Sequence, residues 1–222
     1  MRKRYKVTLI IIILLFVLLG GTTVYMKFFR KQNNESTNKS SVVHNIDEFG
    51  YTLDDRDSDL MKEEFYALEK VLDADEIDYQ AYAKSVSKLF IIDLYTIDNK
   101  INKYDIGGLE YILESEQDKF KNIILDSIYA TVLDDSNHKR EQELPMVKDI
   151  TVNEVKEDTY KYNDSDASSY IVNLSWSYEK DLGYDSNALI TLIKDDQKLF
   201  IVEYTSVDNN EEVSSNWEIL IR

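Results

Sequence analysis

Residues 170–178 read Tyr-Ile-Val-Asn-Leu-Ser-Trp-Ser-Tyr, and an apolar or aromatic side chain stands at every second position. One face of this segment carries Tyr170, Val172, Leu174, Trp176 and Tyr178, while polar residues take most of the other face. A period of two with one apolar face is typical of a β-strand that is buried on one side. The segment therefore predicts an antiparallel sheet with one face on a core and the other face partly wet.

The neighbouring segments extend this sheet. Residues 188–193 and 199–204 flank the polar sequence Lys-Asp-Asp-Gln-Lys at 194–198, which is typical of a β-hairpin. Residues 147–155 and 217–221 are further strand candidates. We therefore expect a sheet of about four strands in the C-terminal half of the chain.

The N-terminal half has a helical period instead. One helix face is formed by Met61, Phe65, Leu68 and Leu72, with Ser58 placed to cap the helix. A second, longer helix is expected to begin at Asp78 and to run toward the glycine pair at 107–108, which allows a tight turn. The apolar positions of this second helix are Tyr82, Val86, Leu89, Phe90, Leu94, Ile97 and Ile101.

A third helix is expected after the glycine pair. The sequence Ser-Glu-Gln-Asp at 115–118 resembles a capping box. The apolar stripe that follows consists of Phe120, Ile123, Ile124, Ile128 and Thr131. Helices first and antiparallel strands second define the α+β class, so we expect helices packed on one face of a curved antiparallel sheet.

An uncharged run occupies residues 7–26. As a helix it spans about 30 Å, the thickness of a bilayer core. The alternative is a cleaved signal peptide, whose apolar part is normally about 7–15 residues and ends in a small-x-small site. We favour an uncleaved transmembrane helix, because the run is longer and continues past Gly20 and Gly21 into apolar residues.

The anchor divides the chain into four parts. Residues 1–6 are expected to form a cytoplasmic tail, 7–26 the transmembrane helix, 27–52 a polar linker and 53–222 an extracytoplasmic α+β domain of a single-pass cell-membrane protein. Basic residues flank the span on both sides, so the orientation follows mainly from the short tail and the long domain. His44 falls in the linker, where we expect it to be solvated.

Composition excludes several classes of function. The chain has 26 Lys and Arg against 42 Asp and Glu, a formal net charge of −16. An acidic surface repels phosphate, so we expect no nucleic-acid partner. The absence of Cys excludes disulfides, thiolate catalysis and Cys-based metal sites, and two His are too few for a multi-His site.

No sequence pattern predicts a catalytic, cofactor-binding or metal-ligating residue. Asp55, Asp57 and Asp59 match three positions of a calcium-binding loop. Leu60 stands where that loop needs glycine, however, and Tyr66 stands where it needs a bidentate glutamate. The acidic clusters at 73–76 and 163–166 match no better, and there is no phosphate-binding glycine loop. A carboxylate pair for glycoside chemistry among the many acids stays an open alternative.

The remaining candidates are interpreted as structural. His138 lies in a charged connection between helices and sheet, where a solvated histidine is expected. Tyr is the overused aromatic residue, with 16 Tyr against 8 Phe. Those on the apolar stripes, such as Tyr82, are expected in the core with their hydroxyls at its edge, and Trp176 and Trp217 are expected to pack likewise. Contact with a partner through exposed Tyr is the alternative.

Two short segments carry a resemblance to a known family. Residues 88–100, Lys-Leu-Phe-Ile-Ile-Asp-Leu-Tyr-Thr-Ile-Asp-Asn-Lys, and 105–108, Asp-Ile-Gly-Gly, are similar to a helix and turn in membrane-anchored proteins of Gram-positive bacteria. The order of anchor, tether, helices and sheet resembles the bitopic scaffold proteins of type IV secretion and conjugation systems. The resemblance implies a cone-shaped, cystatin-like domain of the nuclear-transport-factor-two-like fold. Some conjugation scaffolds have two such domains, whereas this chain has room for one.

Two classes of function remain. We favour a non-enzymatic, membrane-anchored interaction or scaffold domain that binds other envelope proteins or itself, within a secretion or conjugation complex. The alternative is a small-ligand site or an isomerase-like enzyme, because the same fold hosts isomerases and dehydratases. A deep pocket in the concave face of the sheet, with an inward carboxylate beside Tyr hydroxyls, would favour the alternative. A filled cone with an exposed Tyr-bearing surface would favour the scaffold.

Overall fold

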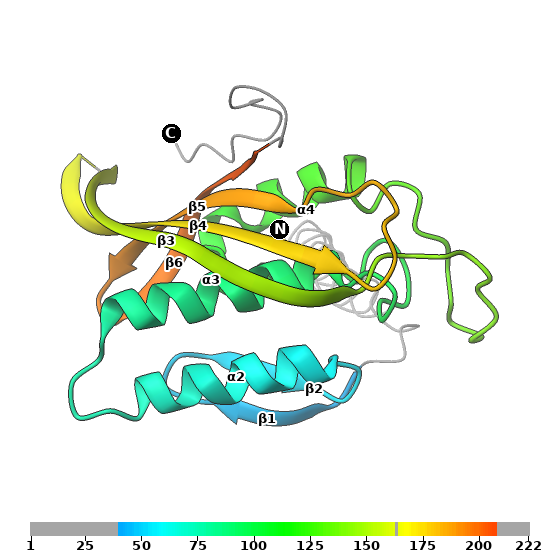
Figure 1. Cartoon of the computed structure of the whole chain (residues 1–222), viewed down its shortest axis with the longest axis horizontal. Helices are drawn as coiled ribbons and strands as arrows, with labels where there is room; N and C mark the ends of the chain where they lie inside the picture. Colours follow the sequence, from blue (N-terminus) through cyan, green and yellow to red (C-terminus); the bar gives the residue numbers. More distant parts are fainter. Residues whose placement is uncertain (1–39, 163, 208–222) are drawn as a thin grey trace, which may run out of the picture. The chain divides into compact units, whose positions relative to one another are not determined.

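The computed structural model describes residues 40–162 and 164–207 (Figure 1). The expected cytoplasmic tail at 1–6, the expected span at 7–26 and the strand candidate at 217–221 lie outside these residues. Within the described ranges, no helix combines the length and the apolar character needed to cross a bilayer. The fold described below concerns the unit that begins at Ser40.

Four antiparallel strands form the expected meander, in the order β3-β4-β5-β6. Their bounds are Val147–Tyr162 for β3, Ser165–Tyr178 for β4, Asn187–Asp195 for β5 and Lys198–Ser206 for β6. The predicted alternation in β4 is confirmed, since Tyr170, Val172, Leu174 and Trp176 are buried. The predicted hairpin at 188–204 is confirmed as β5 and β6, which pair from Ala188 to Asp195.

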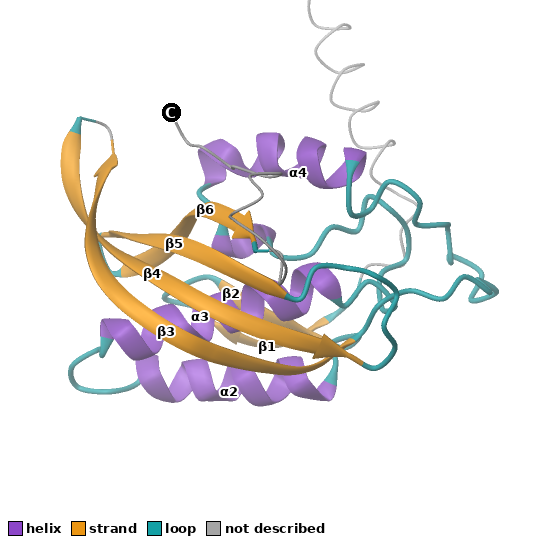
Figure 2. Ribbon diagram, turned by 45° about the horizontal axis from the view of Figure 1, so that its top comes forward, coloured by secondary structure: helices purple, strands orange, loops and turns teal. Residues whose placement is uncertain are grey.

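Two helices cover one face of this sheet, as expected for the α+β class. Helix α3 (Tyr79–Tyr95) lies against the sheet, and helix α2 (Asp59–Leu72) packs on α3 (Figure 2). Both predicted caps are confirmed, because Met61 N donates to Ser58 Oγ at 3.1 Å and Gln80 N donates to Asp78 Oδ1 at 3.0 Å. Each buried Leu, Ile or Phe of these helices contributes about 1.5–3 kcal/mol to folding.

The second predicted helix is too long at its C-terminal end. Helix α3 ends at Tyr95, and Ile97 and Ile101 are buried in the loop that follows. The backbone N–H of Ile97 donates to Pro145 O at 2.9 Å, so a tertiary contact replaces the next helical hydrogen bond. Sequence periodicity misses such a contact because its partner is distant in the chain.

The third predicted helix is shorter than expected, and its capping box is wrong. Two 3₁₀ turns, η1 (Leu109–Tyr111) and η2 (Glu114–Glu116), precede helix α4 (Gln117–Asp126). Residue Glu116 occupies the N-cap of α4 without a side-chain hydrogen bond. Helix α4 still buries Phe120 and Ile124 of the predicted stripe.

The predicted linker at 27–52 is wrong in its last part. Strands β1 (Val42–Ile46) and β2 (Tyr51–Asp54) form an antiparallel hairpin. Ile46, Phe49 and Tyr51 are buried in the main core, and Lys198 Nζ donates to Phe49 O at 2.6 Å. The apolar residues are too scattered among polar ones to show a strand period in the sequence. The folded domain therefore begins near residue 40 and not at 53.

Candidate functional site

The face of the sheet that meets the helices is filled by side chains. Tyr95 and Tyr204 share a hydrogen bond between their hydroxyls at 2.6 Å, and Tyr51 and Tyr82 share one at 2.7 Å. All four side chains are buried, and Trp176 packs on Tyr95 with 5.2 Å between ring centroids. The expected core positions of Tyr82 and Trp176 are thus confirmed.

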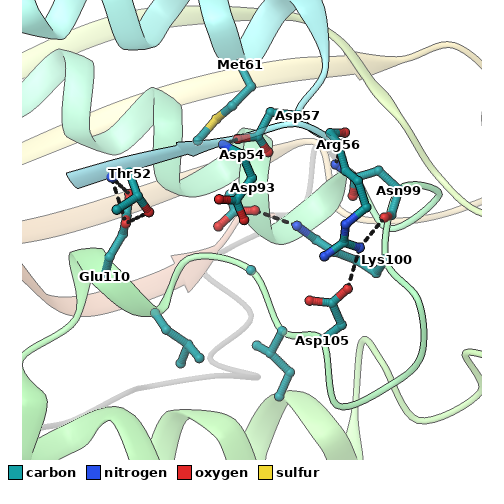
Figure 3. Close-up of a pocket in the computed structure, with 13 residues that line it drawn as sticks. Thr52, Asp54, Arg56, Asp57, Met61, Asp93, Asn99, Lys100, Asp105 and Glu110 are labelled. Atoms are coloured by element: carbon teal, nitrogen blue, oxygen red, sulfur yellow. Dashed lines mark hydrogen bonds and ion pairs between the residues drawn. The ribbon is translucent and has the colours of Figure 1, made fainter. Parts of the chain in front are cut away.

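A polar cavity of about 210 Å³ lies beside this core (Figure 3). Strand β2 contributes Thr52 and Asp54 to its wall, and α3 contributes Asp93. The remaining wall comes from the turn before α2, the loop after α3, Met61 of α2 and the first 3₁₀ turn. The wall includes five carboxyl groups and two cations, those of Asp54, Asp57, Asp93, Asp105, Glu110, Arg56 and Lys100.

The paired glycines after α3 bring the loop close to the helix. A Cβ at Gly107 would lie 2.1 Å from Asp93 O, so no other residue fits there without movement. Gly108 has a φ of +82°, which disfavours other residues, and its N–H donates to Asp93 Oδ2 at 2.6 Å. The turn expected at this glycine pair is confirmed, and it fixes Asp93 in the cavity wall.

One buried ion pair stands at the back of the cavity. Lys100 is only 7% exposed, and its Nζ donates to Asp93 Oδ1 at 2.6 Å. Burial alone would lower the pKa of Lys100, but the charge of Asp93 raises it above its ordinary value. Lys100 is therefore a permanent cation that neutralises Asp93.

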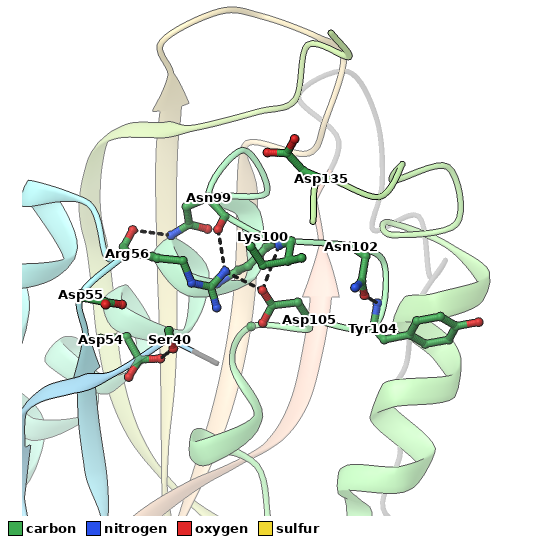
Figure 4. A network of polar contacts seen from close by, with 12 residues as sticks. Ser40, Asp54, Asp55, Arg56, Asn99, Lys100, Asn102, Tyr104, Asp105 and Asp135 are labelled. Atoms are coloured by element: carbon green, nitrogen blue, oxygen red, sulfur yellow. Dashed lines mark hydrogen bonds and ion pairs between the residues drawn. The ribbon is translucent and has the colours of Figure 1, made fainter. Parts of the chain in front are cut away.

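A second ion pair closes the loop side of the cavity (Figure 4). Arg56 Nη1 donates to Asp105 Oδ2 and to Asn99 O, at 2.7 and 2.8 Å. Burial would raise the pKa of Asp105, but the hydrogen bond from Arg56 lowers it below its usual value. Arg140 Nη1 donates to Lys100 O at 2.8 Å from outside the cavity and holds the same loop.

Three carboxyl groups in the wall, those of Asp54, Asp57 and Glu110, form no ion pair among the described residues, and the pKa of two of them is raised. Burial raises the pKa of Glu110 to about 7, assisted by the charge of Asp93, although Thr52 donates to Glu110 from its hydroxyl at 2.9 Å. Burial likewise raises the pKa of Asp57 to about 6, against the hydrogen bond from Asp54 N at 2.6 Å. Carboxyl groups that titrate near neutral pH are suited to proton transfer or to pairing with a bound cation.

Two buried polar atoms of the cavity wall, Arg56 Nε and Asn99 Oδ1, lack hydrogen-bond partners within the described residues. Tyr111 is fully buried and does not line the cavity. After burial itself, the charges of Glu110 and Asp93 raise the pKa of Tyr111, which places its hydroxyl near the Glu110 carboxyl group.

The acids singled out in the sequence do not form a calcium site. Asp57 lies in the cavity, whereas Asp55 accepts hydrogen bonds from Ser41 at the surface and Asp59 is exposed near Lys62. Across the described ranges, no group of three His, Cys, Asp or Glu residues is placed to hold a metal ion.

The two histidines differ from each other. His138 is exposed on a loop, as expected. His44 is half-buried instead of solvated, because its Nε2 lies 2.7 Å from Glu69 Oε1 and its ring packs on Phe65. His44 does not line the cavity.

Sequence reasoning missed the cavity itself. Asp93, Asn99, Lys100 and Asp105 lie in the two segments that carry the family resemblance, yet nothing in their spacing indicated a shared site. Comparisons of the chain with family models, with curated proteins and with solved structures found no match.

Proposed function

We propose that this chain is a membrane-anchored, extracytoplasmic interaction domain that binds envelope proteins or a second copy of itself and catalyses no reaction. The uncharged run at 7–26 supports the membrane anchor. The short tail before this run supports the proposed orientation. The order of elements supports a nuclear-transport-factor-two-like fold and, with it, a place in a secretion or conjugation complex. An α+β domain with helices on one face of a curved sheet is compatible with that fold.

The filled face of the sheet is the observation that carries this proposal. An isomerase-like enzyme of this fold needs an apolar pocket there, with a carboxylate or histidine inside it. In this chain, Tyr95, Tyr204 and Trp176 pack into that space and their polar atoms bond to one another or to neighbouring side chains. A filled face leaves recognition to the outer surface of the domain.

Two exposed features supply such a surface. Within the part of the chain that the structure describes, strand β1 is an edge of its two-stranded sheet, with Val42 56% and Val43 55% exposed, and Tyr66 of α2 is exposed as well. The β3–β4 hairpin continues past Ser169, where the pairing of β4 with β5 ends, and curls away from the sheet (Figure 2). An open strand edge and a projecting hairpin both favour pairing with another chain.

Crosslinking in the cells that make the protein tests this function. A photo-crosslinking amino acid replaces Val43 or Tyr66 in the full chain, and the matched control carries it at Asp118, which is exposed on α4. We expect a discrete adduct, of the same partner, from Val43 and from Tyr66 but not from Asp118. Equal labelling at all three positions, or none at any, would show that this surface binds no partner.

A second function is favoured by the cavity beside the core. Its partly closed wall and its two carboxyl groups that titrate near neutral pH support binding of a small ligand, as a sensor or as an enzyme. The two functions are separated by adding a small ligand to the full chain. Binding of the ligand to the chain with Val43 and Tyr66 unaltered, without protection of any exposed surface from crosslinking, would support the second function and not the first.

A further inference from the structure

We propose that the polar cavity binds one organic cation, an ammonium or guanidinium group carried on a short alkyl chain. The inference rests on the second function proposed above, a ligand-binding cavity, and adds the chemical class of the ligand. The cation comes either from a free amine or from the Lys or Arg side chain of a protein, and the experiment below separates these sources.

Charge is the first reason. Lys100 neutralises Asp93 and Arg56 neutralises Asp105, so both cations of the wall are used. Among the described residues, the carboxyl groups of Asp54, Asp57 and Glu110 form no ion pair, and they accept hydrogen bonds from Ser40, from a backbone N–H and from Thr52, respectively. Three carboxyl groups in one partly closed space repel one another, and a bound cation would relieve that repulsion.

An unpartnered acceptor is the second, independent reason. Asn99 Oδ1 belongs to the cavity wall, is buried and has no hydrogen-bond partner among the described residues. Buried polar atoms in proteins almost always have partners, and an N–H donor of a bound ligand would supply a hydrogen bond to this acceptor.

Size and the apolar part of the wall exclude a bare metal ion. No three His, Cys, Asp or Glu residues among those described are close enough to ligate one. The volume of about 210 Å³ equals the share of about seven waters at ~30 Å³ each, more than one ion fills. Met61, Ile106 and Leu109 line the same space and can cover the methylenes of an alkyl chain.

Binding of a cation must depend on pH. The ionised forms of Glu110 and Asp57 attract the ligand, so affinity should rise as pH increases through the range where these groups lose their protons. The charged and titratable groups that act on these two carboxyl groups come from β2, α3, the following loop, η1 and β6. They are Tyr51, Asp54, Asp93, Lys100, Tyr111 and Lys198.

Calorimetric titration of the full chain in a nonionic detergent tests the proposal. The probes are 1,5-diaminopentane and agmatine as free cations, the methylamides of Nα-acetyl-lysine and Nα-acetyl-arginine as side-chain mimics, 1,5-pentanediol as a neutral analogue and glutarate as an anionic one. We expect one cation per chain at pH 8, binding about tenfold weaker at pH 5.5, and no heat from the diol or glutarate. Tighter binding of the free amines would identify a small molecule as the source, and tighter binding of the methylamides would identify a protein side chain.

Variants locate the site. Glu110→Gln and Asp57→Asn should each weaken cation binding about tenfold, whereas Glu76→Gln and Asp75→Asn remove the same charges from the exposed connection between α2 and α3 and should change nothing. If the diol binds as tightly as the cations, the proposal that the ligand is a cation is refuted, but the proposal of a ligand-binding cavity stands. No binding by any probe, or equal loss in the control variants, would overturn the proposal, and neither result bears on the crosslinking from β1.

Discussion

The substitution Glu110→Gln measures the energetic cost of the unpaired carboxylate in the cavity. The glutamine has nearly the same shape and keeps an acceptor for the Thr52 hydroxyl, but it never carries a charge. Burial raises the pKa of Glu110 from 4.5 to about 7, so the folded state holds a proton that the unfolded state releases between these values. The contribution of Glu110 to the free energy of unfolding is therefore fully present below about pH 4.5, and it is lost as the pH rises to about 7.

The size of the effect follows from the shift. This pKa difference between the folded and unfolded states corresponds to about 3.5 kcal/mol at most, from ~1.4 kcal/mol for each pKa unit. Glu110 is partly exposed to water, and Lys198 is close enough for its positive charge to interact with the Glu110 carboxylate. We therefore expect Glu110→Gln to stabilise the chain by about 1–2 kcal/mol at pH 8 and to be neutral at pH 4.

Urea unfolding of the full chain at both pH values, followed by tryptophan fluorescence, gives this difference. The control Glu76→Gln removes an exposed charge and should shift neither midpoint. Destabilisation by Glu110→Gln of equal size at pH 4 and pH 8 would refute the reasoning, because it would show that the carboxylate contributes hydrogen bonds and not a charge penalty.

Three further predictions concern packing, the buried ion pair and topology. Trp176→Ser should cost about 3–5 kcal/mol in urea unfolding, because it empties a buried aromatic site beside Tyr95, and a loss below about 1 kcal/mol would place Trp176 outside the core. Asp93→Asn should cost about 3–5 kcal/mol by the same assay, because Lys100 is left buried without its counter-charge, and a midpoint equal to that of Asp75→Asn would contradict this. Protease added to intact protoplasts should digest the domain that begins near Ser40, whereas full protection would reverse the predicted orientation.

Much of the fold could be predicted because its main signals are local. The alternation at 170–178 and the stripe from Met61 to Leu72 each depend on neighbouring residues, and both predict elements that the structure contains. The β1–β2 hairpin was missed because its buried residues, Ile46, Phe49, Tyr51 and Leu53, are too few for a visible period.

The cavity could not be predicted because it is made by contacts between distant segments. Arg56 and Asp105 lie 49 positions apart in the chain, and Thr52 and Glu110 lie 58 apart. Each residue alone resembles an ordinary surface charge or a turn residue. Only the glycine pair at 107–108 gave a local signal, and it indicated a turn without indicating that Asp93 and Lys100 would meet there.

The central claim is that the folded domain works by binding another chain through its outer surface. The most direct test is the mass of the complex that the full-length protein forms when it is extracted from membranes in a mild detergent, measured by light scattering with the detergent subtracted. We predict a mass well above the 26.0 kDa of one chain, and a fall toward that value when Val42 and Val43 are both replaced by Lys to block pairing at β1. A single-chain mass for the unaltered protein, or a larger complex that the Lys substitutions leave intact, would contradict the claim.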